Sequence, residues 1–205
     1  MKSLFFKILL VITTFYMVGC SNQPMVIPLP ESSLITNSTV ENKPRIEEVQ
    51  FINKAQEGEL VNPITPFSDS FIPINPETPV YETVESDIKN FIDTNSISGS
   101  KEDKSLRVII EEADAYWVYG GLDKAPFINL LIVGNDKSFG LNLKVRFEIE
   151  VNGKVASTYT YKDNIVINGS AAFTDDIKDS YTMLISEYRR QFFNELKDEL
   201  FKRYL

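Results

Sequence analysis

Proline is distributed so unevenly along this chain that it limits where a folded domain can lie. Nine of the ten prolines fall between Pro24 and Pro79, and the tenth is Pro126. Proline fixes φ and lacks a backbone N–H, so this stretch favours extended conformations over a long helix. We therefore predict that residues 20–78 form an extended, Pro-rich N-terminal arm that acts as a tether, and that residues 79–205 form one folded domain.

Two segments of the arm have features that would let them join the domain. Residues 45–52 (RIEEVQFI) have the composition of an edge strand. Residues 63–79 alternate Pro with Ile and Phe, and could dock along the domain surface. The sequence leaves open whether either segment docks or belongs to the tether.

Helical periodicity appears at both ends of the domain. An apolar residue recurs every four positions after Pro79, which predicts a helix that begins there with Thr78 as its N-cap. A longer apolar stripe runs through residues 177–205, with Asp residues near its start and basic residues near its end, as the helix macrodipole favours. The first stripe consists of Val80, Val84, Ile88, Phe91 and Ile92.

Strand patterns occupy the segment between these helices. Residues 106–119 are β-branched and aromatic, residues 127–133 are apolar throughout, and residues 144–151 alternate between apolar and charged. Asn152-Gly153 follows, which is a strong signal for a type I′ hairpin turn. We therefore predict an α+β fold, in which two helices pack on an antiparallel sheet of about four strands, with an extended N-terminal arm.

The hairpin turn also predicts a register for the strand that follows it. Strict counting from Asn152-Gly153 pairs Val145 with Thr160, so Tyr159 and Tyr161 would share the polar face of the sheet with the basic residues of 144–151. There the two rings would either cover basic side chains or form a contact patch for a partner.

The N-terminus has the features of a signal peptide with a lipid attachment site. Residues 1–19 contain a basic start and an apolar segment at residues 8–18, which is too short to span a bilayer comfortably. The segment ends in MVGC, which resembles the bacterial lipobox, in which Cys20 becomes the lipidated N-terminus. The alternative is an ordinary secretory signal followed by a free Cys20, which would be a liability in an oxidising compartment.

Composition excludes several classes of function. The chain has no His and one Cys, so Ser-His-Asp catalysis, imidazole metal sites and multi-thiolate zinc sites are excluded. The net charge of −8 becomes −10 when cleavage removes Lys2 and Lys7, which argues against binding to nucleic acid and leaves membrane attachment to the lipid. We expect no metal and no cofactor.

Carboxylates are the remaining candidates for catalysis. Glu111 and Glu112 are adjacent on a predicted strand, so alternation would place them on opposite faces, and they could not flank a substrate together. Glu112 and Asp114 would share a face, where a solvated edge is the simpler interpretation. We therefore expect that the protein is not an enzyme.

Aromatic residues are the best candidates for recognition. Trp117 is the only tryptophan and lies in the run YWVY, so alternation places Trp117 and Tyr119 on one face. Either this pair is buried under a helix or it forms an exposed anchor for a partner. The candidate binding residues are Trp117, Tyr119, Tyr159 and Tyr161.

The chain resembles the small outer-membrane lipoproteins of the YajG family. The resemblance is carried by the GC lipobox, by LRVIIEEADAYWVYGG (106–121), by the NG hairpin within residues 143–180 and by the C-terminal helix. Ser21, rather than Asp, follows Cys20, which resembles the pattern of lipoproteins sent to the outer membrane. The resemblance implies a lipid-anchored outer-membrane protein and brings no catalytic residues.

Our leading hypothesis is a non-enzymatic structural or adaptor module of the cell envelope. It would be lipid-anchored in the outer membrane, would face the periplasm and would bind a protein partner. The alternative is a factor that handles lipid or lipopolysaccharide, which predicts basic clusters beside an apolar groove.

Overall fold

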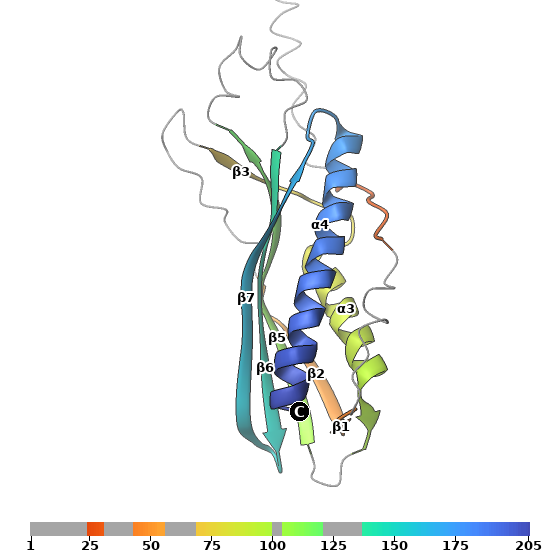
Figure 1. The fold of residues 1–205 in the computed structure, drawn as a ribbon, viewed down its shortest axis with the longest axis vertical. Coiled ribbons are helices and arrows are strands. Elements are labelled where there is room, and N and C mark those ends of the chain that lie inside the picture. Colours follow the sequence, from red (N-terminus) through yellow and green to blue (C-terminus); the bar gives the residue numbers. More distant parts are fainter. Residues whose placement is uncertain (1–23, 31–42, 56–68, 100–103, 121–136) are drawn as a thin grey trace, which may run out of the picture.

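The described part of the chain is an α+β structure with two layers. The computed structural model describes residues 24–30, 43–55, 69–99, 104–120 and 137–205. In these residues, five strands form one sheet, and helices α3 (Val80–Asn95) and α4 (Thr174–Glu195) pack on one of its faces (Figure 1). The predicted fold class is therefore confirmed. The strand predicted at 127–133 lies outside the described residues.

Three long antiparallel strands form the centre of the sheet. They are β5 (Lys104–Tyr119), β6 (Lys137–Val151) and β7 (Lys154–Gly169). The Asn152-Gly153 turn joins β6 to β7, and both residues have positive φ, 53° and 72°, as a type I′ turn requires. The predicted hairpin is therefore confirmed.

Replacing Gly153 of the turn by a residue with a side chain should destabilise the fold. A Cβ there would meet no atom within 4 Å, so any penalty for Gly153→Ala comes from the positive φ alone. We expect Gly153→Ala to lower the free energy of unfolding by about 1–2 kcal/mol. Gly153→Asn should lose less, because Asn tolerates this conformation. Urea unfolding measures both, and wild-type stability for Gly153→Ala would contradict the turn geometry.

The predicted register beyond this turn is wrong by one residue. Val151 pairs with Lys154 as expected, but the register shifts between Ile149 and Glu150, so that Ile149 pairs with Ser157. Ala156 is the extra residue of a β-bulge. From there to the end of β7, each residue lies on the face opposite to the one that strict counting predicts.

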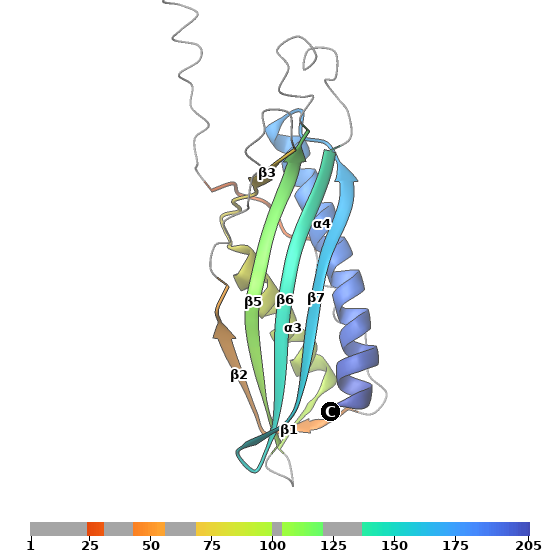
Figure 2. The ribbon, with the colours of Figure 1, turned by 90° about the vertical axis from the view of Figure 1, so that its left-hand side faces the viewer.

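The N-terminal arm contributes two strands to the sheet. Strand β2 (Glu48–Asn53) pairs in parallel with Ser105–Ile110 of β5, and β3 (Ser70–Pro73) pairs antiparallel with the other end of β5. Figure 2 shows β2 and β3 along the same edge of β5. The sequence left open whether either arm segment docks on the domain. Residues 48–52 lie in the edge strand β2, and the described part of residues 63–79 contributes β3. Two described parts of the predicted tether over 20–78 are therefore strands of the sheet, which includes residues before the predicted boundary at residue 79.

A pair of short parallel strands lies at one end of the molecule. Strand β1 (Arg45–Ile46) pairs with β4 (Ile97–Ser98), which directly follows α3. Ile46 is only 3% exposed, so this part of the arm is buried against the domain. The parallel directions of β1 and β2 correct the expectation of a purely antiparallel sheet.

The two helices bury the predicted stripes against the sheet. All five apolar residues predicted for α3 are buried, and α3 begins at Val80, one residue after the predicted start. Helix α4 continues into a π-helical segment, η2 (Leu196–Phe201), which confirms one long C-terminal helix. Aromatic rings fill the layer between α4 and the strands, as shown by the Tyr161 and Phe192 ring centroids at 4.7 Å.

A buried ion pair joins the helices. Arg189 of α4 donates two hydrogen bonds to the Asp87 carboxylate of α3, from Nε at 2.8 Å and from Nη2 at 2.9 Å. Both side chains are 4% exposed. The third donor group of Arg189, Nη1, donates to the carbonyl of Pro30 in the arm. One guanidinium therefore connects both helices and residues 24–30.

Candidate interaction face of the sheet

The sheet has one face that helices do not cover. Both helices lie on the same side of β5, β6 and β7, and the view in Figure 2 is from the opposite side. We call this side the open face. On β6 it carries Lys144, Arg146, Glu148 and Glu150, which is the polar face that the alternation predicts.

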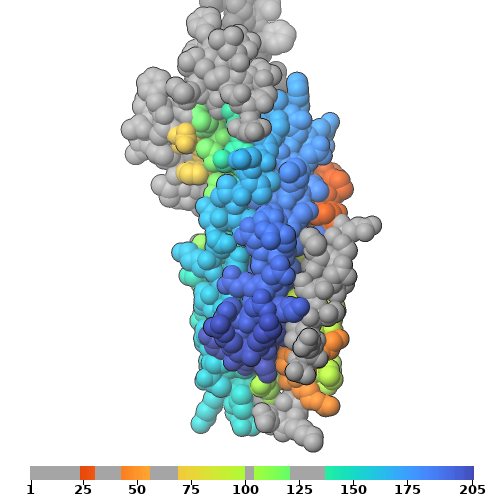
Figure 3. Space-filling view, in the orientation of Figure 1, coloured from red at the N-terminus to blue at the C-terminus, as the bar shows by residue number. Residues whose placement is uncertain are grey.

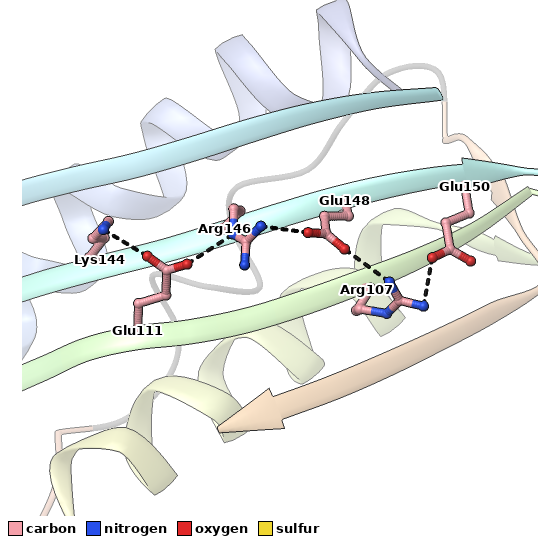
Figure 4. A network of polar contacts seen from close by, with 6 residues as sticks. All are labelled: Arg107, Glu111, Lys144, Arg146, Glu148 and Glu150. Atoms are coloured by element: carbon pink, nitrogen blue, oxygen red, sulfur yellow. Dashed lines mark hydrogen bonds and ion pairs between the residues drawn. The ribbon is translucent and has the colours of Figure 1, made fainter. Parts of the chain in front are cut away.

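Charged side chains on the open face form a continuous chain of ion pairs. The Arg107 guanidinium lies 2.7 Å from Glu150 and 3.0 Å from Glu148. Arg146 then joins Glu148, at 2.7 Å, to Glu111, at 2.9 Å, and the Lys144 ammonium lies 2.8 Å from Glu111 (Figure 4). We call this set the charge ladder; its members are Arg107, Glu111, Lys144, Arg146, Glu148 and Glu150.

The ladder balances its charges and leaves its side chains half-buried. It contains three basic and three acidic groups, with side-chain exposures between 13% and 32%. Hydrogen bonds from Lys144 and Arg146 hold the pKa of Glu111 below its ordinary value, and Glu111 in turn raises the pKa of Lys144. Glu111 and Lys144 are therefore charged at neutral pH, and their ion pair orients both side chains.

Glu111 should contribute more to stability at neutral pH than in acid. Its pKa is lowered from 4.5 in the folded protein, so the ionised carboxylate stabilises the fold above pH 4.5. That contribution is lost as the pH falls through the lowered pKa. We expect Glu111→Gln to lose about 0.5–1 kcal/mol at neutral pH, as for a screened surface network. Wild type and variant should converge in acid when urea unfolding is measured along a pH series.

Glu47→Gln provides the matched control for this prediction, because Glu47 is exposed and lies outside the ladder. It should match wild type throughout the series. A loss for Glu111→Gln that does not change with pH would show that charge pairing is not the cause.

A second bulge places Glu111 and Glu112 on the same face. The pairing of β5 with β6 shifts between Ile110 and Glu112, where Glu112 is the register partner of Lys144. Glu111 also reaches Lys144, so the expected placement of the two carboxylates on opposite faces is wrong. Placement on opposite faces therefore does not prevent Glu111 and Glu112 from acting as an acid pair. A general acid needs a raised pKa, whereas bonding to two cations lowers the pKa of Glu111.

Tyr159 and Tyr161 lie in the core and not on the open face. The bulge at Ala156 pairs Tyr159 with Phe147 and Tyr161 with Val145, which are core residues of β6. Tyr159 is 9% exposed, Tyr161 is 2% exposed, and Tyr159 donates a 2.8 Å hydrogen bond to Glu195 of α4. The prediction that both rings lie on the polar face of the sheet, on which their proposed binding role depended, is therefore wrong.

Trp117 and Tyr119 lie together at the end of β5. Their rings form an edge-to-face pair with centroids 5.9 Å apart, and the Lys137 ammonium lies 5.9 Å from the Tyr119 ring centroid. Both residues are partly exposed, and Trp117 packs against the core. Their role as binding residues stays a prediction.

Tyr116 spans the open face near the same end. Its ring lies over Gly140 of β6, and its hydroxyl donates a 3.0 Å hydrogen bond to the side chain of Asn164 on β7. Phe71 of β3 packs edge-to-face on this ring at 5.2 Å. One aromatic side chain therefore ties the arm, β5, β6 and β7 together.

The described residues also bear on metal and membrane binding. Within the described ranges, no group of three or more His, Cys, Asp or Glu side chains is placed to hold a metal ion. No helix among them has the length and apolar character needed to cross a bilayer. Cys20 and the predicted signal peptide lie outside the described residues.

Two members of the charge ladder were not predicted from the sequence. Alternation along residues 144–151 predicts the β6 members of the open face, but it does not predict that Arg107 and Glu111 of β5 pair with them. The phase of the apolar residues carried a signal. Leu106, Val108 and Ile110 alternate, and the pattern then resumes at Ala113, which indicates one extra residue between them.

Comparison with known proteins gives little information about relatives. No protein-family model matches the sequence, and no curated protein matches it. One solved structure, the protein XCC0632 from Xanthomonas campestris, of the family model DUF330, is similar over 86% of this chain and 95% of that chain. Its identity is 8% and its TM-score is 0.43, so the likeness carries no argument about family or function. The resemblance to YajG stays a prediction.

Proposed function

We propose that this protein is a non-enzymatic lipoprotein adaptor of the cell envelope. Its lipid anchor is Cys20, in the outer membrane, and its open face binds a protein partner in the periplasm. The observation that carries the adaptor function is the open face, where six charged side chains are held in one network.

Preorganisation of the ladder supports a role in binding. Ordering a free, rotamer-rich side chain at an interface costs about 0.5–1.5 kcal/mol, and ladder side chains are already held by their neighbours. Alternating charges also favour a partner with the complementary pattern and disfavour others. The long free edge of β7 lies beside this surface among the described strands, and its Thr158, Thr160 and Lys162 are exposed.

The packing of the core favours an adaptor over a lipid-handling factor. Lipid binding would need an apolar groove with basic groups beside it. Between sheet and helices, the space is filled by buried rings such as Tyr161, Tyr188 and Phe192. The basic members of the ladder are paired with carboxylates and lie on the other side of the sheet.

Site-specific photocrosslinking in the envelope tests the adaptor function. A photoreactive amino acid at Thr160 would present the reactive group on the open face, since Thr160 is exposed and pairs with Arg146. The matched control is Asn194, an exposed residue of α4 in the helical layer. We expect one discrete protein adduct from position 160 and none from position 194. Equal crosslinking from both positions, or none from 160, would contradict the proposal.

A further inference from the structure

Residues 24–30 are bound to the domain close to the expected anchor. The amide of Met25 donates to the carbonyl of Asn75, and the Met25 carbonyl accepts from the amide of Glu77, both at 2.8 Å. Further along, the Pro28 carbonyl accepts from Thr182 of α4. Figure 3 shows this segment, in orange-red, against the side of α4.

The direction of this segment along α4 indicates which end of the domain is nearer Cys20. Pro30 contacts Arg189 and Pro28 contacts Thr182, so the chain approaches the start of α4 as residue numbers fall. Those two α4 residues are seven positions apart, or about 10 Å along the helix. The segment therefore leads from the middle of α4 toward the end that contains Phe173. We call this end the apex.

The short distance from Cys20 to Pro24 limits how the domain can stand on a membrane. Four residues span at most about 14 Å when fully extended. Met25 lies at the level of Ala115 of β5. Its amide is hydrogen-bonded to the carbonyl of Asn75, and the amide of the preceding residue, Ile74, donates a hydrogen bond to the carbonyl of Ala115. Leu141 and Ile165 are the register partners at this level.

The opposite end of the sheet is too far from Met25 to rest on the bilayer. Val155, beside the hairpin turn, lies ten residues from Ile165 along β7, which is about 30 Å. An anchor about 14 Å long cannot hold Pro24 that far from the membrane. An orientation with the hairpin toward the lipid is therefore excluded for a protein anchored at Cys20.

Exposed apolar side chains occur toward the apex. Phe173, directly before α4, is 71% exposed, and Met183, in the third turn of α4, is 56% exposed. Val26 of the arm is 67% exposed, and it precedes Pro28, which contacts Thr182 beside Met183 in the chain. We call Phe173, Met183 and Val26 the apical patch. Phe side chains are typical of segments that lie at the boundary between headgroups and acyl chains. Other exposed apolar side chains lie at the hairpin end, which the length of the anchor keeps from the membrane; they are Ile97, Val155 and Tyr204.

The surface of α3 argues against a domain that lies flat on its helical layer. Its exposed positions are all polar or charged, so this side would not gain by contact with acyl chains. These positions are Glu82, Ser86, Lys89, Asn90 and Asp93.

We infer that the domain stands on the membrane by its apex, with the apical patch against the lipid surface and the hairpin end directed away from it. The inference rests on the proposed anchor at Cys20. In this orientation the open face stands roughly perpendicular to the bilayer, where a partner can reach it. The first two turns of α4 carry three acidic residues, Asp175, Asp176 and Asp179, and one basic residue, Lys178, so a zwitterionic lipid surface fits this end better than an anionic one.

Tryptophan quenching by brominated lipid tests the orientation, because Trp117 is the only tryptophan. In a Trp117→Phe background, Phe173→Trp places a probe at the apex, and Val155→Trp places one near the hairpin, where Val155 is similarly apolar and 52% exposed. The lipidated full-length chain is reconstituted into phosphatidylcholine vesicles with brominated acyl chains. We expect strong quenching at position 173 and none at position 155.

Flotation with the same vesicles separates the two proposals. If the protein floats and position 155 is quenched as much as position 173, or neither is quenched, the orientation is wrong although the anchor holds. If the wild-type chain fails to float, or floats equally after Cys20→Ser, the proposed anchor itself fails. A circular dichroism spectrum like that of wild type confirms that each variant is folded.

Discussion

Asp87→Ala is expected to lower the free energy of unfolding by about 3–5 kcal/mol, which is the usual effect of removing one partner of a buried ion pair. The substitution would leave the Arg189 guanidinium without its carboxylate at a site where both side chains are 4% exposed. Because Arg189 also donates to Pro30, the docked arm should loosen too. Urea unfolding measures the loss, and limited proteolysis of residues 24–30 measures the loosening.

Two further variants test whether burial of the ion pair causes this loss. Asp198→Ala removes one partner of an exposed pair with Lys202, whose side chains are about 60% exposed, and should cost less than about 1 kcal/mol. The double variant Asp87→Leu/Arg189→Met should recover much of the loss and should fold even if Asp87→Ala does not. Similar losses for Asp87→Ala and Asp198→Ala would contradict the proposed importance of burial.

Gly140→Ala is expected to cost about 1–3 kcal/mol, as for an overpacked site. A Cβ at position 140 would lie 2.3 Å from Cζ of Tyr116, whose ring is held by Phe71 and by the hydrogen bond to Asn164. The ring must move, and the tie across β5, β6 and β7 is weakened. Urea unfolding measures this loss.

A double-mutant cycle identifies the cause of that loss. In a Tyr116→Ala background, Gly140→Ala should be neutral or stabilising, because no ring lies over the glycine and Ala is favoured over Gly within a strand. The same loss in both backgrounds would show that the contact with Tyr116 does not explain the effect.

The fold class was predictable because its strongest signals are local. The spacing of Val80, Val84, Ile88 and Ile92 predicts the buried face of α3, and Asn152-Gly153 predicts the turn between β6 and β7. Both depend on residues close in sequence, where periodicity and turn chemistry act directly.

The register of β7 could not be predicted by counting from the turn. One extra residue at Ala156 reverses the faces, and a bulge has no fixed sequence signature. The apolar pattern conflicts with strict counting, since Tyr159, Tyr161, Ile165 and Ile167 all have odd numbers and share the core face. Burial of two tyrosines outweighs the regular register, because each ring removes much apolar surface from water.

The role of the arm was only partly predictable because it depends on contacts between distant residues. Proline correctly predicts the extended conformation of residues 24–30 and 70–73, but not what those segments contact. Their partners are β5 and α4, and the contact between Pro30 and Arg189 joins residues 159 positions apart. An extended chain can therefore serve as an edge of the fold instead of a free tether.

The proposed anchor at Cys20 determines where the adaptor acts, and the apical orientation rests on it. The most direct measurement is fractionation of cells that produce the full chain, combined with the mass of its N-terminal peptide. We predict that wild type is in the outer-membrane fraction with a lipid-modified N-terminal peptide that begins at Cys20, and that Cys20→Ser is released from the membrane. An unmodified Cys20, or a Cys20→Ser protein that stays in the membrane fraction, would contradict the account.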